Sequence, residues 1–189
     1  MFGELAADTD RNKLITSNLA DAYRRGRRTL ALANRIEHLD LIASALDGLD
    51  VPAQRLHGGL PTAERARVRA AMAPNSPGPI IVLAIDKIAG EGLDADLDAL
   101  FLMNPVSFKG RVIQQVGRIM RTGPDKTDVE VHDYLDASVP MLERMHHKRR
   151  RLLEKSSFTP ASTPPPGTSR RTGLAPAATG SRNIATAQA

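Results

Sequence analysis

Apolar and polar residues alternate along positions 10 to 154 with two different periods, and together these periods predict an α/β fold. Five short segments carry the apolar runs or the two-residue alternation of β-strands, and they span residues 29–33, 51–56, 79–85, 99–103 and 128–135. The middle segments are apolar enough for burial on both faces, as in a parallel sheet. Segments of helical period separate them. We therefore expect three layers, with a parallel sheet, right-handed crossovers and helices on both faces.

Capping residues indicate where the helices begin. Asn34 and Glu37 have the spacing of a capping box ahead of residues 36–46, and Thr62 is suited to cap the helix that follows it. A third helix, over residues 138–155, is expected to close the domain. Each predicted helix begins a few residues after a predicted strand, as the crossovers of an α/β domain do.

The residues after position 155 differ in composition from the rest of the chain. They are rich in Pro, Ser, Thr, Ala and Gly, and they contain too few large apolar side chains to offset the entropy of ordering. We expect an N-terminal extension over residues 1–9, one domain over 10–155, and a disordered basic tail over 156–189. Removal of residues 159–189 is then expected to leave the thermal transition nearly unchanged.

The net charge of +5 is concentrated near the C-terminal end. From position 155 onward the chain has no acidic residue and four basic ones, namely Lys155, Arg170, Arg171 and Arg182, so the predicted domain is nearly neutral. The high pI by itself therefore says little about partners. A weak contact between these arginines and nucleic acid is one interpretation, and a plain solvated tail is the more common one.

Composition also bears on compartment and metal binding. Cysteine is absent, which excludes disulfides and thiolate metal sites. Residues 1–10 lack the features of a signal peptide, and the longest apolar run, 80–85, is too short to cross a bilayer, so we expect a cytoplasmic protein without membrane contact. Four histidines lack the spacing of metal ligands and are interpreted as structural or exposed: His38, His132, His146 and His147. No metal site is expected.

The loops that follow the strands are the candidate site, because ligands of parallel α/β sheets gather at the carboxyl ends of the strands. Residues 57–59, with the sequence HGG, follow the second predicted strand, and residues 86–96 follow the third. Residues 104–110 follow the fourth strand and lead into 114–123, QQVGRIMRTG, where glutamines and arginines gather around one glycine. The residues with the most hydrogen-bonding capacity therefore fall on one edge.

The segment that contains QQVGRIMR divides into two faces when it is placed on a helix. Polar side chains fall within an arc of about 120°, and these are Arg111, Gln114, Gln115, Arg118 and Arg121. Apolar side chains take the opposite face. Gly117 lies at the margin of the polar face, where a missing side chain allows a ligand or backbone to come close. The pattern fits either a ligand-binding face or an ordinary solvated helix.

Several of these segments resemble the motifs of superfamily 2 helicases, in the same order along the chain. Residues 114–121, QQVGRIMR, resemble the Q-x-x-G-R-x-x-R motif VI, and residues 83–105 resemble motif V with the strand that follows it. Residues 29–46 are similar to motif IV, and LHGGL at 56–60 is similar to the loop after the next strand. The resemblance covers about residues 10–154 and is to the C-terminal domain of DEAD/DEAH-box helicases of phage and conflict-system type.

The resemblance implies the second RecA-like domain of a two-domain motor, which has the P-loop NTPase type of fold without the P-loop itself. In this family ATP and Mg²⁺ lie between two such domains, and the first domain holds the metal. By resemblance, Arg118 and Arg121 are arginine fingers, and Gln114 contacts the nucleotide or a neighbouring motif. Gly92 and Asp94 match positions near the ribose and the interdomain contact, although a turn and a helix cap also explain them.

Nucleic acid is the other partner that the resemblance implies, with DNA expected in preference to RNA. His57, Gly58 and Gly59 are expected to face it, because the backbone of a glycine loop can approach phosphate closely. Asn34 and Arg35 occupy the end of the motif IV strand and are expected to contact it as well. A strand-to-helix turn and an N-cap with a surface arginine are the structural explanations of the same residues.

The sequence also departs from the family. The 189 residues contain no Gly-Lys dipeptide, and hence no phosphate-binding loop of the form G-x-x-x-x-G-K-[ST], and no Asp-Glu pair for Mg²⁺. Ile85 stands where motif V commonly has Thr or Ser. Two functions therefore remain open. One is the C-terminal half of an ATP-dependent helicase or translocase, inactive alone and completed by a first RecA-like domain in trans. The other is a non-catalytic module that binds nucleic acid or a helicase.

Overall fold

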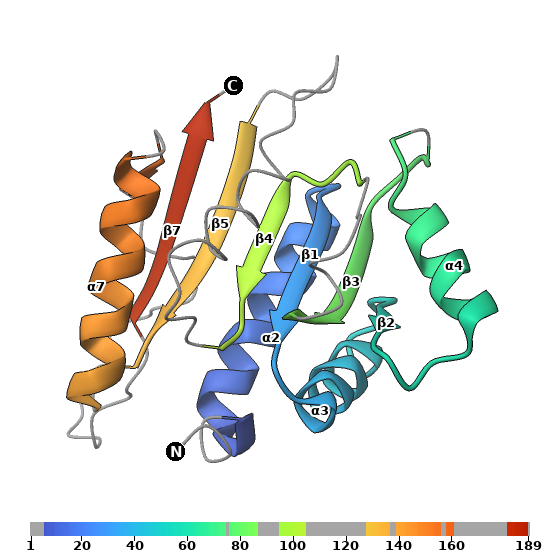
Figure 1. Ribbon diagram of the computed structural model, residues 1–189, viewed down its shortest axis with the longest axis horizontal. Helices are drawn as coiled ribbons and strands as arrows, with labels where there is room; N and C mark the ends of the chain where they lie inside the picture. The colour runs from blue at the N-terminus through green and yellow to red at the C-terminus, as the bar shows by residue number, and fades with distance from the viewer. Residues whose placement is uncertain are drawn as a thin grey trace.

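Five parallel strands form the centre of the fold in a computed structural model (Figure 1). The structure describes residues 6–74, 76–86, 95–104, 128–136, 139–155, 158–160 and 181–188. The five strands are β1 Arg28–Ala33, β2 Gln54–Leu56, β3 Ile80–Ile85, β4 Ala99–Leu102 and β5 Asp128–Leu135. They lie in the order β2-β3-β1-β4-β5, and every neighbouring pair is parallel. The predicted parallel sheet is confirmed.

Helices cover both faces of this sheet, which gives the predicted three layers. The described helices of ten or more residues are α2 Thr9–Arg24, α3 Ile36–Asp47, α4 Thr62–Ala71 and α7 Pro140–Lys155. One apolar layer joins α2 and α3 to the sheet through Leu19, Ile42 and Phe101. The other joins α4 and α7 through Met72 and Leu153. No described helix is long and apolar enough to cross a membrane.

The alternation of side chains along the strands explains how two cores form on one sheet. In β1, Leu30 and Leu32 belong to the layer beneath α4 and α7, whereas Ala31 and Ala33 belong to the layer beneath α2 and α3. Successive side chains of a strand point to opposite faces. Because both faces are covered by helices, the central strands need apolar residues at every position, and this is the pattern that predicted them.

The helix starts differ from the capping prediction by one residue. Helix α3 begins at Ile36 after Arg35, whose extended backbone has φ −134° and ψ 136° and whose side chain makes no capping bond. Asn34 therefore lies one residue before the N-cap. Helix α4 begins at Thr62 itself after Pro61, so Thr62 does not cap it either. The sequence has acceptors near both helix starts, but the register of the preceding loop decides which residue becomes the cap.

Helix α2 was not assigned from the sequence, and its start has a clear physical cause. Asp8 has an extended backbone, and its carboxylate accepts a hydrogen bond from the backbone N–H of Arg11 at 3.0 Å. An aspartate at the N-cap satisfies an amide that the helix leaves unpaired. Ile15 and Leu19 are fully buried against the sheet, while Lys13 is exposed. The helix is therefore amphipathic and packs by its apolar stripe.

Two described segments of the region expected to be a disordered tail, residues 159–160 and 181–188, form strands. Strand β7, Ser181–Gln188, pairs antiparallel with the whole of β5, from Asp128 opposite Gln188 to Leu135 opposite Ser181, and β6, Thr159–Pro160, pairs with β7. The prediction considered only apolar burial. Without β7, β5 would be an edge strand with unpaired N–H and C=O groups, and a pairing segment needs no large apolar side chains to satisfy them.

Ion pairs at the amino edge of the sheet join the end of α2 to β5. Arg27 donates through both terminal nitrogens to both carboxylate oxygens of Asp128, at 2.7 Å each, and Arg25 pairs with the buried Glu130. Burial raises the pKa of Glu130, but the hydrogen bond from His132 and the positive charges of Arg25 and Arg27 outweigh it, so the pKa lies below its ordinary value. The carboxylate therefore stays ionised and holds its partners.

Candidate functional site

The carboxyl edge of the sheet carries the predicted nucleic-acid residues that the structure describes. Asn34 and Arg35 follow β1, and His57, Gly58 and Gly59 follow β2. Because the strands are parallel, both groups emerge at the same edge, but β3 separates β1 from β2 in the sheet. The structure therefore places them on a common rim and on non-adjacent strands.

The loop after β2 is compact. The backbone N–H of Leu60 donates to the carbonyl of His57 at 3.2 Å, which closes a turn over the two glycines. A Cβ added to Gly59 would lie 3.2 Å from Nδ1 of His57, which is tighter than an ordinary van der Waals contact. The imidazole therefore lies against the glycine backbone. Both glycines are exposed, so their backbone is open to a ligand, as the sequence analysis expects.

Asn34 and Arg35 are exposed at the end of β1. The carbonyl of Arg35 accepts the first helical hydrogen bond, from the N–H of Leu39 at 3.4 Å, and its side chain takes no part in capping. The guanidinium group of Arg35 therefore makes no capping hydrogen bond to α3. A contact from either residue to nucleic acid remains a prediction.

The predicted nucleotide-binding and finger residues, Gly92, Asp94, Gln114, Arg118 and Arg121, lie outside the described residues. The strands that lead to them are described. Ile85 ends β3, and its half-buried side chain packs against the apolar layer beneath α2 and α3. A hydroxyl there would face apolar side chains, which gives a packing reason for the departure from the motif V pattern.

Three buried or half-buried polar side chains, those of Asn12, His38 and Asn104, form a hydrogen-bonded network at the same edge that the sequence analysis did not predict. Nδ1 of His38 in α3 lies 3.2 Å from Oδ1 of Asn104, which follows β4, and Nε2 lies 2.9 Å from Oδ1 of Asn12 in α2. The amide nitrogen of Asn12 donates to the carbonyl of Ala6 at 2.8 Å, which fixes that amide. This network of hydrogen bonds therefore connects α2 and α3 to the end of β4.

The protonation of His38 follows from this geometry. Burial is the largest cause and lowers the pKa of His38; the hydrogen bond with Asn104 opposes it, and the positive charge of Arg11 makes the smallest contribution, which also lowers the pKa. A neutral imidazole has one donor and one acceptor. Nε2–H then donates to Asn12, and Nδ1 accepts if the Asn104 amide turns its nitrogen, otherwise buried without a partner, toward it. No sequence spacing joins residues 12, 38 and 104, so only the fold reveals them.

A neighbouring ion pair fixes α2 against β5. Nε of Arg11 lies 2.9 Å from Oδ1 of Asp136, with both side chains almost fully buried, and the guanidinium lies 5.6 Å from the centre of the Tyr134 ring. Asn18 donates to the hydroxyl of Tyr134 at 3.3 Å. Asp136 directly follows β5, so this pair belongs to the carboxyl edge as well. Polar side chains of α2, namely Arg11, Asn12 and Asn18, therefore hold this helix against the sheet and α3.

The four histidines that the sequence analysis interprets as structural or exposed all lie among the described residues. His38, His132 and His146 are buried, and the ring of His132 stacks on Phe101 with centroids 3.9 Å apart. His147 is exposed. In the part of the chain that the structure describes, no three His, Asp or Glu residues are grouped closely enough to hold a metal ion.

A family model decides the class of this domain. The model for the helicase conserved C-terminal domain matches residues 10–123, which is more than half of the chain and includes the segment QQVGRIMR. The chain belongs to this helicase C-terminal domain family. No curated protein sequence matches the chain.

Solved structures show the same fold for this helicase C-terminal domain. T4 UvsW superposes with a TM-score of 0.62 at 14% identity, over 82% of this chain and 34% of its own. Helicase MrfA, bound to DNA and AMPPNP, gives 0.60 at 12% identity, over 76% and 20%. The E. coli DEAD-box protein SrmB, bound to regulator of ribonuclease activity A, gives 0.51 at 17%, over 60% and 65%. The chain thus spans about a third of T4 UvsW and a fifth of MrfA.

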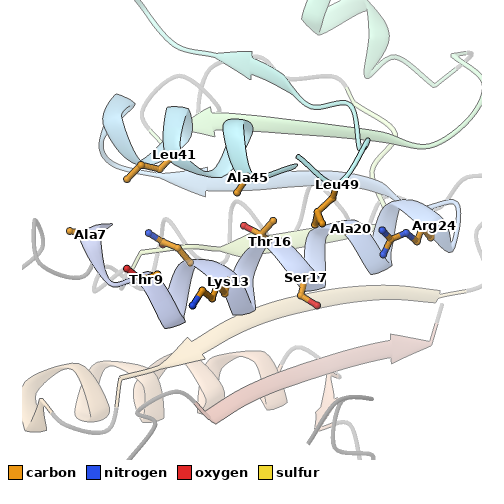
Figure 2. A pocket seen from close by; sticks show the side chains of 11 residues that line it. Ala7, Thr9, Lys13, Thr16, Ser17, Ala20, Arg24, Leu41, Ala45 and Leu49 are labelled. Carbon is orange, nitrogen blue, oxygen red and sulfur yellow. The ribbon is translucent and has the colours of Figure 1, made fainter. Parts of the chain in front are cut away.

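A groove of about 590 Å³ also lies between α2 and α3 of the helicase C-terminal domain (Figure 2). Small residues of both helices line it, among them Thr16, Ala20 and Ala45, together with the exposed Leu41 and Leu49. The predicted site residues that the structure describes, Asn34, Arg35, His57, Gly58 and Gly59, do not line it. The described loops after β1 and β2 therefore do not contribute to this groove.

The lowered pKa of His38 predicts a pH dependence of stability. The unfolded chain binds a proton at His38 below about pH 6.5, whereas the folded domain resists it. The contribution of His38 is therefore fully present above pH 6.5 and is lost as the pH falls from there through the folded pKa. Urea unfolding at several pH values should show this fall, and His38→Gln should reduce it. An equal pH slope in wild type and variant would contradict the prediction.

Proposed function

We propose that this chain is the C-terminal RecA-like half of an ATP-dependent nucleic-acid helicase or translocase. The family match that includes QQVGRIMR supports the proposal most strongly, because that segment holds the two arginines to which the proposal assigns the role of fingers. The parallel sheet supports it too, because the loops after β1 and β2 and the described end of β4 lie at one edge. A ligand held at that edge would meet several motifs at once.

In the proposed reaction, Arg118 and Arg121 act on the γ-phosphate of ATP held by a first RecA-like domain. A guanidinium presents a rigid, planar set of donors that fits phosphate oxygens whose charge spreads in the transition state. ATP and Mg²⁺ would lie mainly against the first domain, with Gln114, Gly92 and Asp94 contributing from this chain. Mg²⁺ neutralises charge on the phosphates, and this chain orients and completes the site.

Nucleic acid is proposed to contact the loops after β1 and β2. Exposed Gly58 and Gly59 leave the backbone open to phosphate, and the side chain of Arg35 is exposed and free of any capping bond. Backbone contacts of this kind position a strand without reading its sequence. We propose DNA in preference to RNA. Alternating closure of the two domains would then couple ATP turnover to movement along the strand.

The first test is ATP hydrolysis by these 189 residues alone and with a first domain added. The sequence has neither the phosphate-binding loop nor the carboxylate pair for Mg²⁺, so we expect no turnover from the chain alone, with or without DNA. Addition of a cognate domain that carries both motifs should restore DNA-stimulated turnover. Turnover by the isolated chain, abolished by Arg118→Ala, would show that the chain is not a half-site. Failure of every cognate domain to restore it would favour a non-catalytic binding module.

A further inference from the structure

A stripe of cations runs along the outer face of α7. It consists of Arg144, Lys148, Arg151 and Lys155, and all four side chains are exposed. Their spacing of four, three and four residues places them within an arc of about 60° at 100° per residue. Along the helix axis the stripe extends for about 16 Å. In Figure 1, α7 lies at the side of the sheet formed by β5 and β7, with this length of helix along it.

Buried contacts on the opposite face hold α7 in this orientation. Its buried residues are Leu142, His146, Arg149 and Leu153, which repeat with the same spacing. Nε of Arg149 lies 2.9 Å from Oδ2 of Asp133 in β5, and Nη2 lies 2.8 Å from Oδ1. This paired contact fixes the rotation of the helix about its axis. The four stripe cations are therefore directed away from the sheet.

The acidic residues of α7 do not neutralise the stripe. Glu154 accepts from Nε of Arg150 at 2.9 Å, and Glu143 lies 3.8 Å from Nε2 of His147. Both pairs lie to one side of the stripe on the helical wheel. Within the described ranges, none of the four stripe cations forms an ion pair. Among the described residues, the outer face of α7 thus presents four positive charges in a row that no acidic side chain pairs with.

We propose that this stripe binds the phosphate backbone of duplex nucleic acid, in addition to the motif loops. A row of flexible cations matches a polyanion, and neutralising its phosphates releases counterions. Helix α7 has no Phe, Tyr or Trp, so it offers no platform for stacking the bases of a single strand. The core of a protein interface is usually depleted of charge and enriched in aromatic residues, which is the reverse of this face. The inference rests on nucleic acid being the partner in the proposed function.

The test measures binding of a fluorescently labelled 20-base-pair DNA duplex by fluorescence anisotropy at a series of salt concentrations. The test variant replaces the four stripe residues with glutamine: Arg144→Gln, Lys148→Gln, Arg151→Gln and Lys155→Gln. Four lost phosphate contacts should make the slope of log K against log salt shallower by about 3 to 4, and should weaken binding at 0.1 M salt by at least about 10²-fold. Glutamine preserves helix propensity, so circular dichroism should be unchanged.

A matched control variant removes the same amount of charge from exposed cations that already pair with an acid on their own helix: Lys13→Gln, Arg24→Gln, Arg67→Gln and Arg150→Gln. Its salt slope should change by less than about 1. Equal losses in both variants, an unchanged slope in the stripe variant, or no duplex binding by wild type would each overturn the inference. Restored ATP turnover with a first domain is measured separately, so the proposed function can stand when the stripe fails.

Discussion

Replacing Arg118 with Ala is expected to cut ATP turnover by roughly 10³-fold when a cognate first domain is supplied. An arginine finger acts mainly on charge that develops in the transition state, so kcat should fall far more than nucleotide affinity. Arg121→Ala should have a similar effect. The measurement is a reconstituted ATPase assay with saturating DNA, together with nucleotide binding to the same pair of domains.

Arg118→Lys provides the sharper control for the same experiment. It keeps the positive charge but loses the planar set of donors, so it should not restore turnover. Because the sequence predicts that both arginines lie on the polar face of a helix, all three substitutions should change the free energy of unfolding by no more than about 0.5 kcal/mol. Full activity in all three variants would mean that QQVGRIMR is only a solvated helix face, and the enzymatic proposal would give way to a binding module.

The strands of this fold could be predicted from the sequence, because burial on both faces leaves a plain signal. Residues 80–85 and 99–102 are apolar at every position, and both became central strands. The second strand, Gln54–Leu56, is shorter than predicted. Val51 was included in the prediction because it is apolar, and it is indeed buried, but it does not belong to the strand. Pro52, with no N–H to donate, also does not favour a ladder at that position.

Only those residues of the candidate site that belong to a sequence motif could be predicted. The glycine loop at 57–59 and the exposed Arg35 lie at the predicted edge because strand order along the chain and right-handed crossovers leave few alternatives. The hydrogen-bonded network of His38 could not be predicted, because its members come from α2, α3 and the end of β4 and share no spacing. Strand β7 was missed for a related reason, since backbone pairing leaves little trace in composition.

The run KRRR at 148–151 shows how packing resolves what a sequence leaves ambiguous. Four adjacent cations look alike in the sequence, but they have different environments in the structure. Arg149 is buried and pairs with Asp133, whereas Arg150 is exposed and pairs with Glu154. Lys148 and Arg151 are exposed. The spacing of Leu142, His146, Arg149 and Leu153 holds the signal for this division, because it marks one face of a helix. An arginine at such a position requires a buried acid, and the sequence does not say which one.

Replacing Arg149 with Met is therefore expected to lower the free energy of unfolding by about 3–5 kcal/mol. Methionine fills the space of the aliphatic stem, but the carboxylate of Asp133, whose side chain is 4% exposed, loses its bidentate partner in a low-dielectric layer. Among the described residues, His146 also lies close to that carboxylate, with Nδ1 3.0 Å from Oδ2. Urea unfolding followed by circular dichroism measures the loss.

Two comparisons separate the buried pair from a general effect of charge on α7. Arg150→Met removes the adjacent, exposed cation and its pair with Glu154, and should cost no more than about 1 kcal/mol. The double variant Asp133→Leu with Arg149→Met removes both charges, so it should recover most of the stability, since the cost arises from an unpaired buried charge. A loss in Arg149→Met no larger than that in Arg150→Met would show that Arg149 does not anchor α7. The orientation of the cationic stripe would then need another cause.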